Sequence, residues 1–155
     1  MKKIITTLTI ISALSIISVF LVIFLVPTKT KFIKPPFDKN SIKGFPEVSN
    51  NLGYQEFQVG ESYVVFLCGK VYKTNNKLTL YFTSIKENDV YVKLKIYKND
   101  KEIAETGLIK PGEYIKEVNL NKRVKKGDEI VIKVMSYEKD TYYSMGVVTL
   151  NTTVL

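Results

Sequence analysis

Three tyrosines and a lysine, Tyr137, Tyr142, Tyr143 and Lys139, gather in one polar stretch near the end of the chain. A tyrosine offers a flat apolar ring and a hydroxyl group, a combination that suits a protein interface or sugar stacking. A neighbouring lysine acts on the rate of association more than on affinity. We therefore predict that these four residues contribute to contact with a partner. The alternative is that the tyrosines form aromatic pairs that cover a sheet.

Enzyme chemistry has few candidate residues in this chain, which has no histidine and one cysteine. The absence of histidine therefore excludes three kinds of site: a histidine general base, a Ser-His-Asp triad and a histidine-ligated metal. Cys68 follows an apolar run and is expected to be a small core residue. Carboxylate pairs such as Glu87 with Asp89 lie among lysines at turn signals, as in ordinary solvated loops. We expect neither an enzyme nor a bound cofactor or metal ion.

The elements that position these residues are predicted to be strands, because the hydrophobic period becomes two after about Gly53. In Val90–Tyr97, apolar residues alternate with tyrosine and lysine, as in an antiparallel sheet with one dry face. Further strands are expected at residues 54–59, 63–72, 77–83, 103–105, 114–120, 130–135 and 148–154. This all-β pattern, with turn residues between the runs, predicts an antiparallel β-sandwich of immunoglobulin-like or fibronectin-like type. A small barrel is the alternative.

The first third of the chain begins with an apolar run, residues 4–26, that contains no charged side chain. As a helix this run reaches about 34 Å, enough to cross a hydrocarbon core of about 30 Å. It is longer than the apolar part of a signal peptide, and no small-residue cleavage pair follows it. We predict a single uncleaved transmembrane helix after a cytoplasmic segment, residues 1–3. A cleaved signal peptide is the alternative.

The segment after the apolar run is predicted to be a linker. Residues 27–46 contain four of the five prolines and several lysines, which favour an extended and hydrated spacer. We expect its part from Phe37 onward to lie along the domain, which is assigned to residues 47–155. Long domains cross membranes largely regardless of their charge, and the domain is rich in tyrosine and threonine. The protein is therefore expected in the cell membrane as a single-pass protein, with its C-terminal domain extracytoplasmic.

The net charge of the whole chain is +8. Without Lys2 and Lys3, 21 basic residues stand against 15 acidic ones, a net charge of +6. The lysines alternate singly with apolar residues, which is typical of a solvated sheet face, whereas binding of phosphates needs clustered charge. We therefore expect no nucleic acid partner. Diffuse positive charge is compatible with an anionic cell-wall polymer or with lipid headgroups.

Four stretches of sequence carry a resemblance to known proteins. They are Pro35-Pro36-Phe37-Asp38, Gly53-Tyr54-Gln55-Glu56, residues 105–114 (ETGLIKPGEY) and residues 149–153 (TLNTT). With these the chain resembles a group of short membrane-anchored β-sandwich proteins of Gram-positive bacteria, often associated with mobile or conjugative elements. The resemblance implies the fold and a place in the cell envelope, and its genomic association suggests a role at the surface during DNA transfer. It implies no site residues.

Two classes of function remain. The first is a membrane-tethered extracytoplasmic interaction or structural module, accessory to a conjugative or surface assembly, with a protein partner in the envelope. The alternative is a carbohydrate or cell-wall-binding β-sandwich module. The chain has no tryptophan, which counts against the alternative because sugar platforms favour large flat rings.

Overall fold

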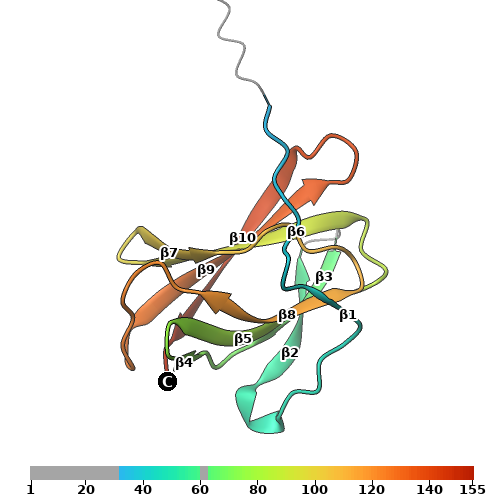
Figure 1. Cartoon of the computed structure of the whole chain (residues 1–155). Helices are drawn as coiled ribbons and strands as arrows, with labels where there is room; N and C mark the ends of the chain where they lie inside the picture. Colours follow the sequence, from blue (N-terminus) through green and yellow to red (C-terminus); the bar gives the residue numbers. More distant parts are fainter. Residues whose placement is uncertain (1–31, 60–62) are drawn as a thin grey trace, which may run out of the picture. The chain divides into compact units, whose positions relative to one another are not determined.

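The computed structural model describes residues 32–59 and 63–155, and its larger compact unit runs from Lys34 to Leu155 (Figure 1). The predicted transmembrane helix at residues 4–26 lies outside the described residues. Among the residues that are described, no helix is long and apolar enough to cross a membrane. The prediction of an all-β chain is confirmed for this part of the protein.

Two antiparallel sheets form the domain. The first has the strand order β1-β8-β5-β3-β2, with β4 also paired to β5, and the second has the order β10-β9-β6-β7. The strands are β1 (Ile42–Lys43), β2 (Tyr54–Val59), β3 (Tyr63–Cys68), β4 (Tyr72–Thr74), β5 (Lys77–Ser84), β6 (Val90–Lys98), β7 (Lys101–Glu105), β8 (Glu113–Asn119), β9 (Glu129–Glu138) and β10 (Ser144–Thr153). A short 3-10 turn, Asn50–Leu52, precedes β2.

The core lies between the two sheets, as the alternation in the sequence predicts. On β6, Val92, Leu94 and Ile96 are fully buried, and the intervening residues are half-exposed. Leu80 and Phe82 of β5 are equally buried and belong to the same cluster. Full burial of such a side chain contributes roughly 1.5 to 3 kcal/mol, so these residues contribute strongly to the stability of the domain.

Two strands differ from the sequence-based expectation. The strand expected at residues 63–72 is interrupted after Cys68, because Gly69 and Lys70 turn away and hydrogen-bond to the backbone of Gly53 and Leu52. The last strand begins at Ser144 rather than at Val148, since a bulge between Ser144 and Gly146 breaks the period of two that would have revealed it.

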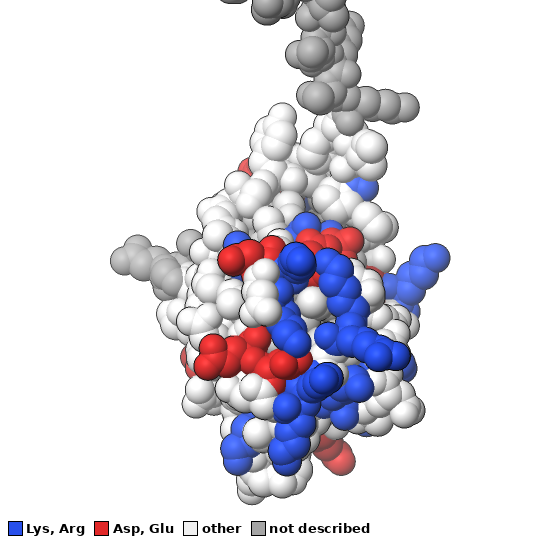
Figure 2. All heavy atoms as spheres, turned by 90° about the vertical axis from the view of Figure 1, so that its left-hand side faces the viewer, with Lys and Arg blue, Asp and Glu red and all other residues white. Residues whose placement is uncertain are grey.

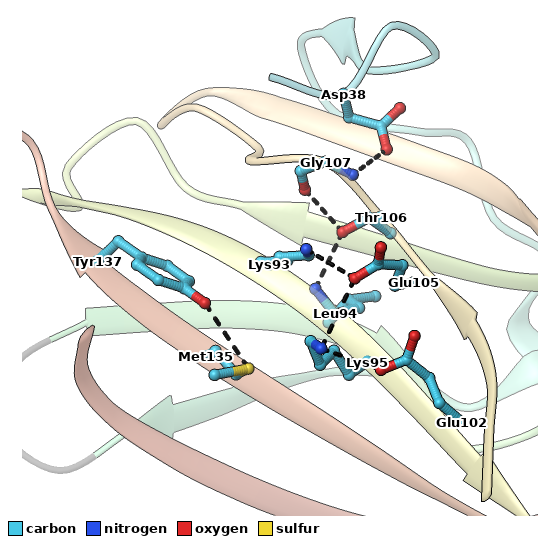
Figure 3. Close-up of polar contacts among 10 residues, drawn as sticks. All are labelled: Asp38, Lys93, Leu94, Lys95, Glu102, Glu105, Thr106, Gly107, Met135 and Tyr137. Carbon is cyan, nitrogen blue, oxygen red and sulfur yellow. Dashed lines mark hydrogen bonds and ion pairs between the residues drawn. The ribbon is translucent and has the colours of Figure 1, made fainter. Parts of the chain in front are cut away.

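Part of the expected linker belongs to the sandwich. The Leu108 N–H donates to the Pro36 carbonyl and the Asp38 N–H donates to the Leu108 carbonyl, both at 2.8 Å, and β1 pairs with β8. The Asp38 carboxylate also accepts a hydrogen bond from the Gly107 N–H at 2.8 Å (Figure 3). The compact unit therefore begins at Lys34 and not at residue 47.

This contact requires glycine at position 107. A Cβ atom built there would lie 2.5 Å from the Asp38 nitrogen and 2.7 Å from the Asp38 Cα, closer than such atoms approach. Backbone would have to move to accommodate it, because neither neighbour is the end of a flexible side chain. Gly107 thus sets how closely residues 36–38 approach the end of β7.

We predict that Gly107→Ala lowers the free energy of unfolding by about 1 to 3 kcal/mol, the usual cost of overpacking, and exposes residues 36–43 to protease. The measurement is urea denaturation followed by limited proteolysis. Gly69→Ala is the matched control: its new Cβ would meet the Gly53 oxygen at 3.5 Å, an ordinary contact, so a change within about 0.5 kcal/mol is expected. Equal effects of the two substitutions would contradict this account of Gly107.

Candidate functional site

The predicted partner-binding residues lie on and beside the loop between β9 and β10. The Tyr142 N–H donates to the Glu138 carbonyl and the Glu138 N–H donates to the Tyr143 carbonyl, both at 3.0 Å, which closes the loop. Tyr142 adopts a φ of +60°, in the left-handed region that residues other than glycine rarely adopt. This backbone conformation turns two adjacent tyrosines into different surroundings.

Tyr142 belongs to an aromatic cluster formed by Phe37, Tyr91 and Tyr142 with Lys34 and Lys110. The Tyr142 ring stacks on Tyr91, with 5.7 Å between centroids and 26° between planes. Phe37 meets Tyr91 edge-on at 5.0 Å. The ammonium groups lie over rings, Lys34 at 4.1 Å from the Tyr142 centroid and Lys110 at 4.6 Å from that of Phe37. The cluster therefore ties the entering chain to β6 and to the β9–β10 loop.

Tyr137 and Lys139 are engaged within the domain. Tyr137 stands opposite Tyr91 in the β6–β9 pairing and is half-buried, with its hydroxyl 3.8 Å from the Met135 sulfur (Figure 3). The Lys139 ammonium pairs with the Asp89 carboxylate at 2.8 Å and donates to the Asn88 carbonyl. Lys139 thus joins the β9–β10 loop to the β5–β6 loop.

The loop before β6 is itself fixed by a buried side chain. The Asn88 amide donates to the Val64 carbonyl at 2.7 Å, and its oxygen accepts from the Val64 N–H at 2.8 Å. Asn88 is 4% exposed, so these bonds satisfy polar groups that would otherwise be costly to bury. They hold the neighbouring Asp89 where Lys139 reaches it.

Two of the three lysines of β6 are paired with carboxylates of β7. Lys93 pairs with Glu105 at 2.7 Å and Lys95 pairs with Glu102 at 2.9 Å (Figure 3). The hydrogen bond from Lys93 lowers the pKa of Glu105, and the hydrogen bond to Glu102 raises the pKa of Lys95. Figure 2 shows acidic side chains interspersed with groups of lysines on the β7 side of the domain. Lys93 and Lys95 thus each have a carboxylate close by.

A group of exposed apolar residues lies where β10 begins, directly after Tyr142 in the sequence. Tyr143, Met145 and Val147 are 67%, 59% and 54% exposed, and we call these three residues the hairpin patch. Val147 stands opposite Met135 in the β9–β10 pairing, so the patch continues onto the outer face of the sheet. Exposed apolar residues that adjoin one another mark interaction surfaces more often than isolated ones do.

Of the four predicted residues, Tyr143 offers the most exposed surface, and Met145 and Val147 were not anticipated. The bulge at residues 144–146 concealed them, because alternation seemed to start only at Val148. Phe37 had a signal in the sequence, since three phenylalanines are many for a free linker. The contact of Lys34 with Tyr142 had none.

The described residues contain neither a candidate metal centre nor an exposed thiol. Within residues 32–59 and 63–155, no group of three or more side chains of the metal-binding types is placed to hold a metal ion. Cys68 is a free thiol that is 2% exposed, and its burial raises its pKa to about 11. The reactive form of a cysteine is the thiolate, so Cys68 is inert at neutral pH.

No protein-family model matches the sequence, and no curated protein matches it either. The described part of the chain is therefore characterised by its own architecture, a domain of two antiparallel sheets with an aromatic cluster and an apolar patch at one end.

We predict that the free energy of unfolding declines from about pH 8.5 upward because of Cys68. An unfolded thiol has a pKa of about 8.5, whereas the folded one titrates near 11. The stabilising contribution is thus complete below about pH 8.5 and is lost as the pH rises toward 11. Urea denaturation at pH 8 and pH 10 should differ by about 1 to 2 kcal/mol more in the wild type than in Cys68→Ala.

The upper limit of pH 10 separates this effect from that of Tyr54, whose pKa is raised to about 12 by burial and whose contribution is lost only above its ordinary value of about 10. A thiol reagent that modified Cys68 in the folded protein at pH 7.5, or equal pH dependence in the two proteins, would contradict the prediction.

Proposed function

We propose that the chain is a membrane-tethered module of the cell envelope, whose extracytoplasmic domain, an immunoglobulin-like or fibronectin-like β-sandwich, binds another protein. The observation that carries this proposal is the hairpin patch, three apolar side chains at positions 143, 145 and 147 that are each more than half exposed. The uncharged run at residues 4–26 supports the tether. An accessory role in a conjugative or surface assembly belongs to the same proposal and rests on the resemblance stated above.

The entry point of the chain bears on which partner the patch can reach. Lys34, the first residue of the compact unit, contacts Tyr142 beside the patch. If residues 4–26 span the membrane, residues 27–33 connect the span to Lys34, and seven extended residues reach at most about 25 Å. The patch then lies at the tethered end of the domain. A partner near the membrane surface, such as another anchored protein, fits this position best.

A carbohydrate-binding module is the second candidate, and the environments of the tyrosines favour the first. A sugar platform needs an accessible ring face, but Tyr142 is already stacked on Tyr91 and contacted by Lys34. Tyr143 is the exposed ring of this group. A surface of one tyrosine, a methionine and a valine is more typical of protein interfaces, where tyrosine and methionine are enriched.

The first prediction from this proposal concerns the tether. In cells that express the full chain with a C-terminal tag, the protein should remain with the membrane fraction at its full length. External protease added to intact spheroplasts should remove the tag. A shortened and freely soluble product would show that residues 4–26 are a cleaved signal peptide, and a protected tag would show the opposite orientation.

The second prediction concerns the hairpin patch. Tyr143→Ala with Met145→Ala should reduce recovery of the partner in membrane crosslinking about tenfold or more, because truncation of a hot-spot residue, a class enriched in tyrosine, costs about 2 kcal/mol or more. The melting temperature should stay within about 2 °C of the wild type, since both side chains are largely exposed.

The matched control is Ile42→Ala, which removes an exposed apolar side chain (51%) from β1, remote from the patch in the strand order. It should leave recovery unchanged. Tyr142→Ala should instead lower the melting temperature, because Tyr142 stacks on Tyr91. If the patch variant lost binding to purified cell wall but kept its protein partners, the carbohydrate module would replace the proposed function.

A further inference from the structure

The strand β10 has an unusual composition for the edge of a sheet. It is the terminal strand of the second sheet and runs for ten residues, Ser144–Thr153, without a charged residue or a proline. Edge strands expose unpaired backbone groups, and proteins commonly protect them with lysine, proline or a covering segment. This strand has none of the protecting residue types.

The backbone hydrogen bonds show which groups of β10 face away from β9. The Gly127 N–H donates to the Val154 carbonyl and the Val154 N–H donates to the Asp128 carbonyl, so the backbone of Val154 points toward the β9 side. Backbone groups alternate in direction along a strand. Thr149 and Val147 therefore direct their N–H and carbonyl groups to the open edge.

Only the last part of this edge is covered by described residues. Val71 forms a bridge with Val154, the Leu155 N–H donates to the Val71 carbonyl, and the Thr152 hydroxyl donates to the Gly69 carbonyl. From Ser144 to Asn151, no strand of the described chain pairs with this side of β10. The open stretch is long enough for a strand of ordinary length to pair with it.

The other edges of the two sheets are protected. On the opposite edge of the same sheet, β7 has three charged residues among its five (Lys101–Glu105), and residues 36–38 pair with the segment that follows it. In the first sheet, β1 is two residues long and β2 has Glu56 at its centre. Among these edge strands, β10 is the long one that carries neither a charge nor a proline, and its one protecting feature is the bulge at Ser144–Gly146.

We propose that β10 pairs in antiparallel fashion with β10 of a second copy of this chain, so that two four-stranded sheets become one continuous sheet. This proposal goes beyond the function proposed above and does not depend on it. A second copy fits the strand by charge: although each chain is basic, the two strands bring no charged side chains together. A charged partner strand would find no complementary charge on β10.

Two-fold symmetry is compatible with the open stretch. An axis through Val148, near the middle of Ser144–Asn151, places Val147 of each copy opposite Thr149 of the other. Both residues direct backbone groups outward, so the two strands satisfy one another's N–H and carbonyl groups. Such a closed interface, in which each copy uses the same surface, is the commonest form of homodimer.

The test is crosslinking of the full chain in membranes. Thr149→Cys places a thiol on an exposed position of β10, within about 10 Å of its symmetry mate by strand geometry. A short bis-maleimide should give a covalent dimer. The parent protein should give none, because Cys68 is buried. Lys101→Cys, an exposed position on the β7 edge, is the matched control and should give at least about tenfold less dimer.

A second substitution in the Thr149→Cys protein tests whether the edge itself is responsible. Val147→Pro removes an N–H that points outward, so it spares the β9 pairing while it blocks a new strand. Val147→Thr keeps that N–H. We expect the dimer to fall about tenfold or more with proline and to persist with threonine. Val147→Lys, which places like charges close together in the dimer, should reduce it as well, with an unchanged melting temperature.

Several results would overturn the proposal. Equal dimer yields from the two edges, or a yield that persists in folded Val147→Pro and Val147→Lys proteins, would show that β10 is not the contact. A crosslink only to a different protein would assign the edge to another partner. Failure of the thiol introduced by Thr149→Cys to react even with a monofunctional maleimide would show that a part of the same chain covers it.

Discussion

The end of the domain that carries the aromatic cluster depends on a close approach between two backbone segments, at Asp38 and Gly107. A carboxylate and a glycine N–H meet there at 2.8 Å, and no larger residue than glycine fits at position 107. This contact fixes Phe37, and through it the position of Lys34 beside Tyr142. The aromatic cluster therefore depends on backbone packing beside β7, at the edge of the sheet opposite β10. Contacts among its rings stabilise this end of the domain, but they do not determine where the entering chain lies.

The sequence predicts the central strands well for a physical reason. In β6 the alternation between buried and half-exposed residues is complete, because one face packs on the core and the other faces water. The same reasoning fails where the direction of a side chain in the strand no longer determines whether the side chain is buried. At the start of β10 a bulge shifts the phase and apolar residues stay exposed, so neither the strand nor the hairpin patch follows from periodicity. The break after Cys68 depends on backbone bonds to Gly53 and Leu52, which no local pattern records.

The sequence likewise predicts one part of the candidate site and not the rest. The gathering of Tyr137, Tyr142 and Tyr143 around one loop could be predicted because their spacing in the sequence is short. Their different environments could not, since these depend on the left-handed conformation of Tyr142 and on Tyr91, some fifty residues away. Lys139 illustrates the same limit: composition identifies a charged loop residue, whereas its pairing with Asp89 is a tertiary contact. Lys93 and Lys95 of β6 have the sequence pattern of a solvated sheet face, and only the register with β7 reveals their carboxylate partners.

The backbone contacts of Val154 and Leu155 with Val71 affect how β10 can move. Among the described residues, the contacts of Gly69 and Val71 hold the end of β10 at Thr152 and Thr153 on the side away from β9, whereas Ser144–Asn151 pair with β9 only. Local opening requires the least free energy where backbone groups have the fewest partners. Amide protons should accordingly exchange with solvent along a gradient within this one strand, most rapidly near Ser144 and most slowly near Val154. We therefore expect β10 to open locally from its hairpin end while its far end stays paired. The largest fluctuations of this strand would then occur at the end of the domain where the chain enters.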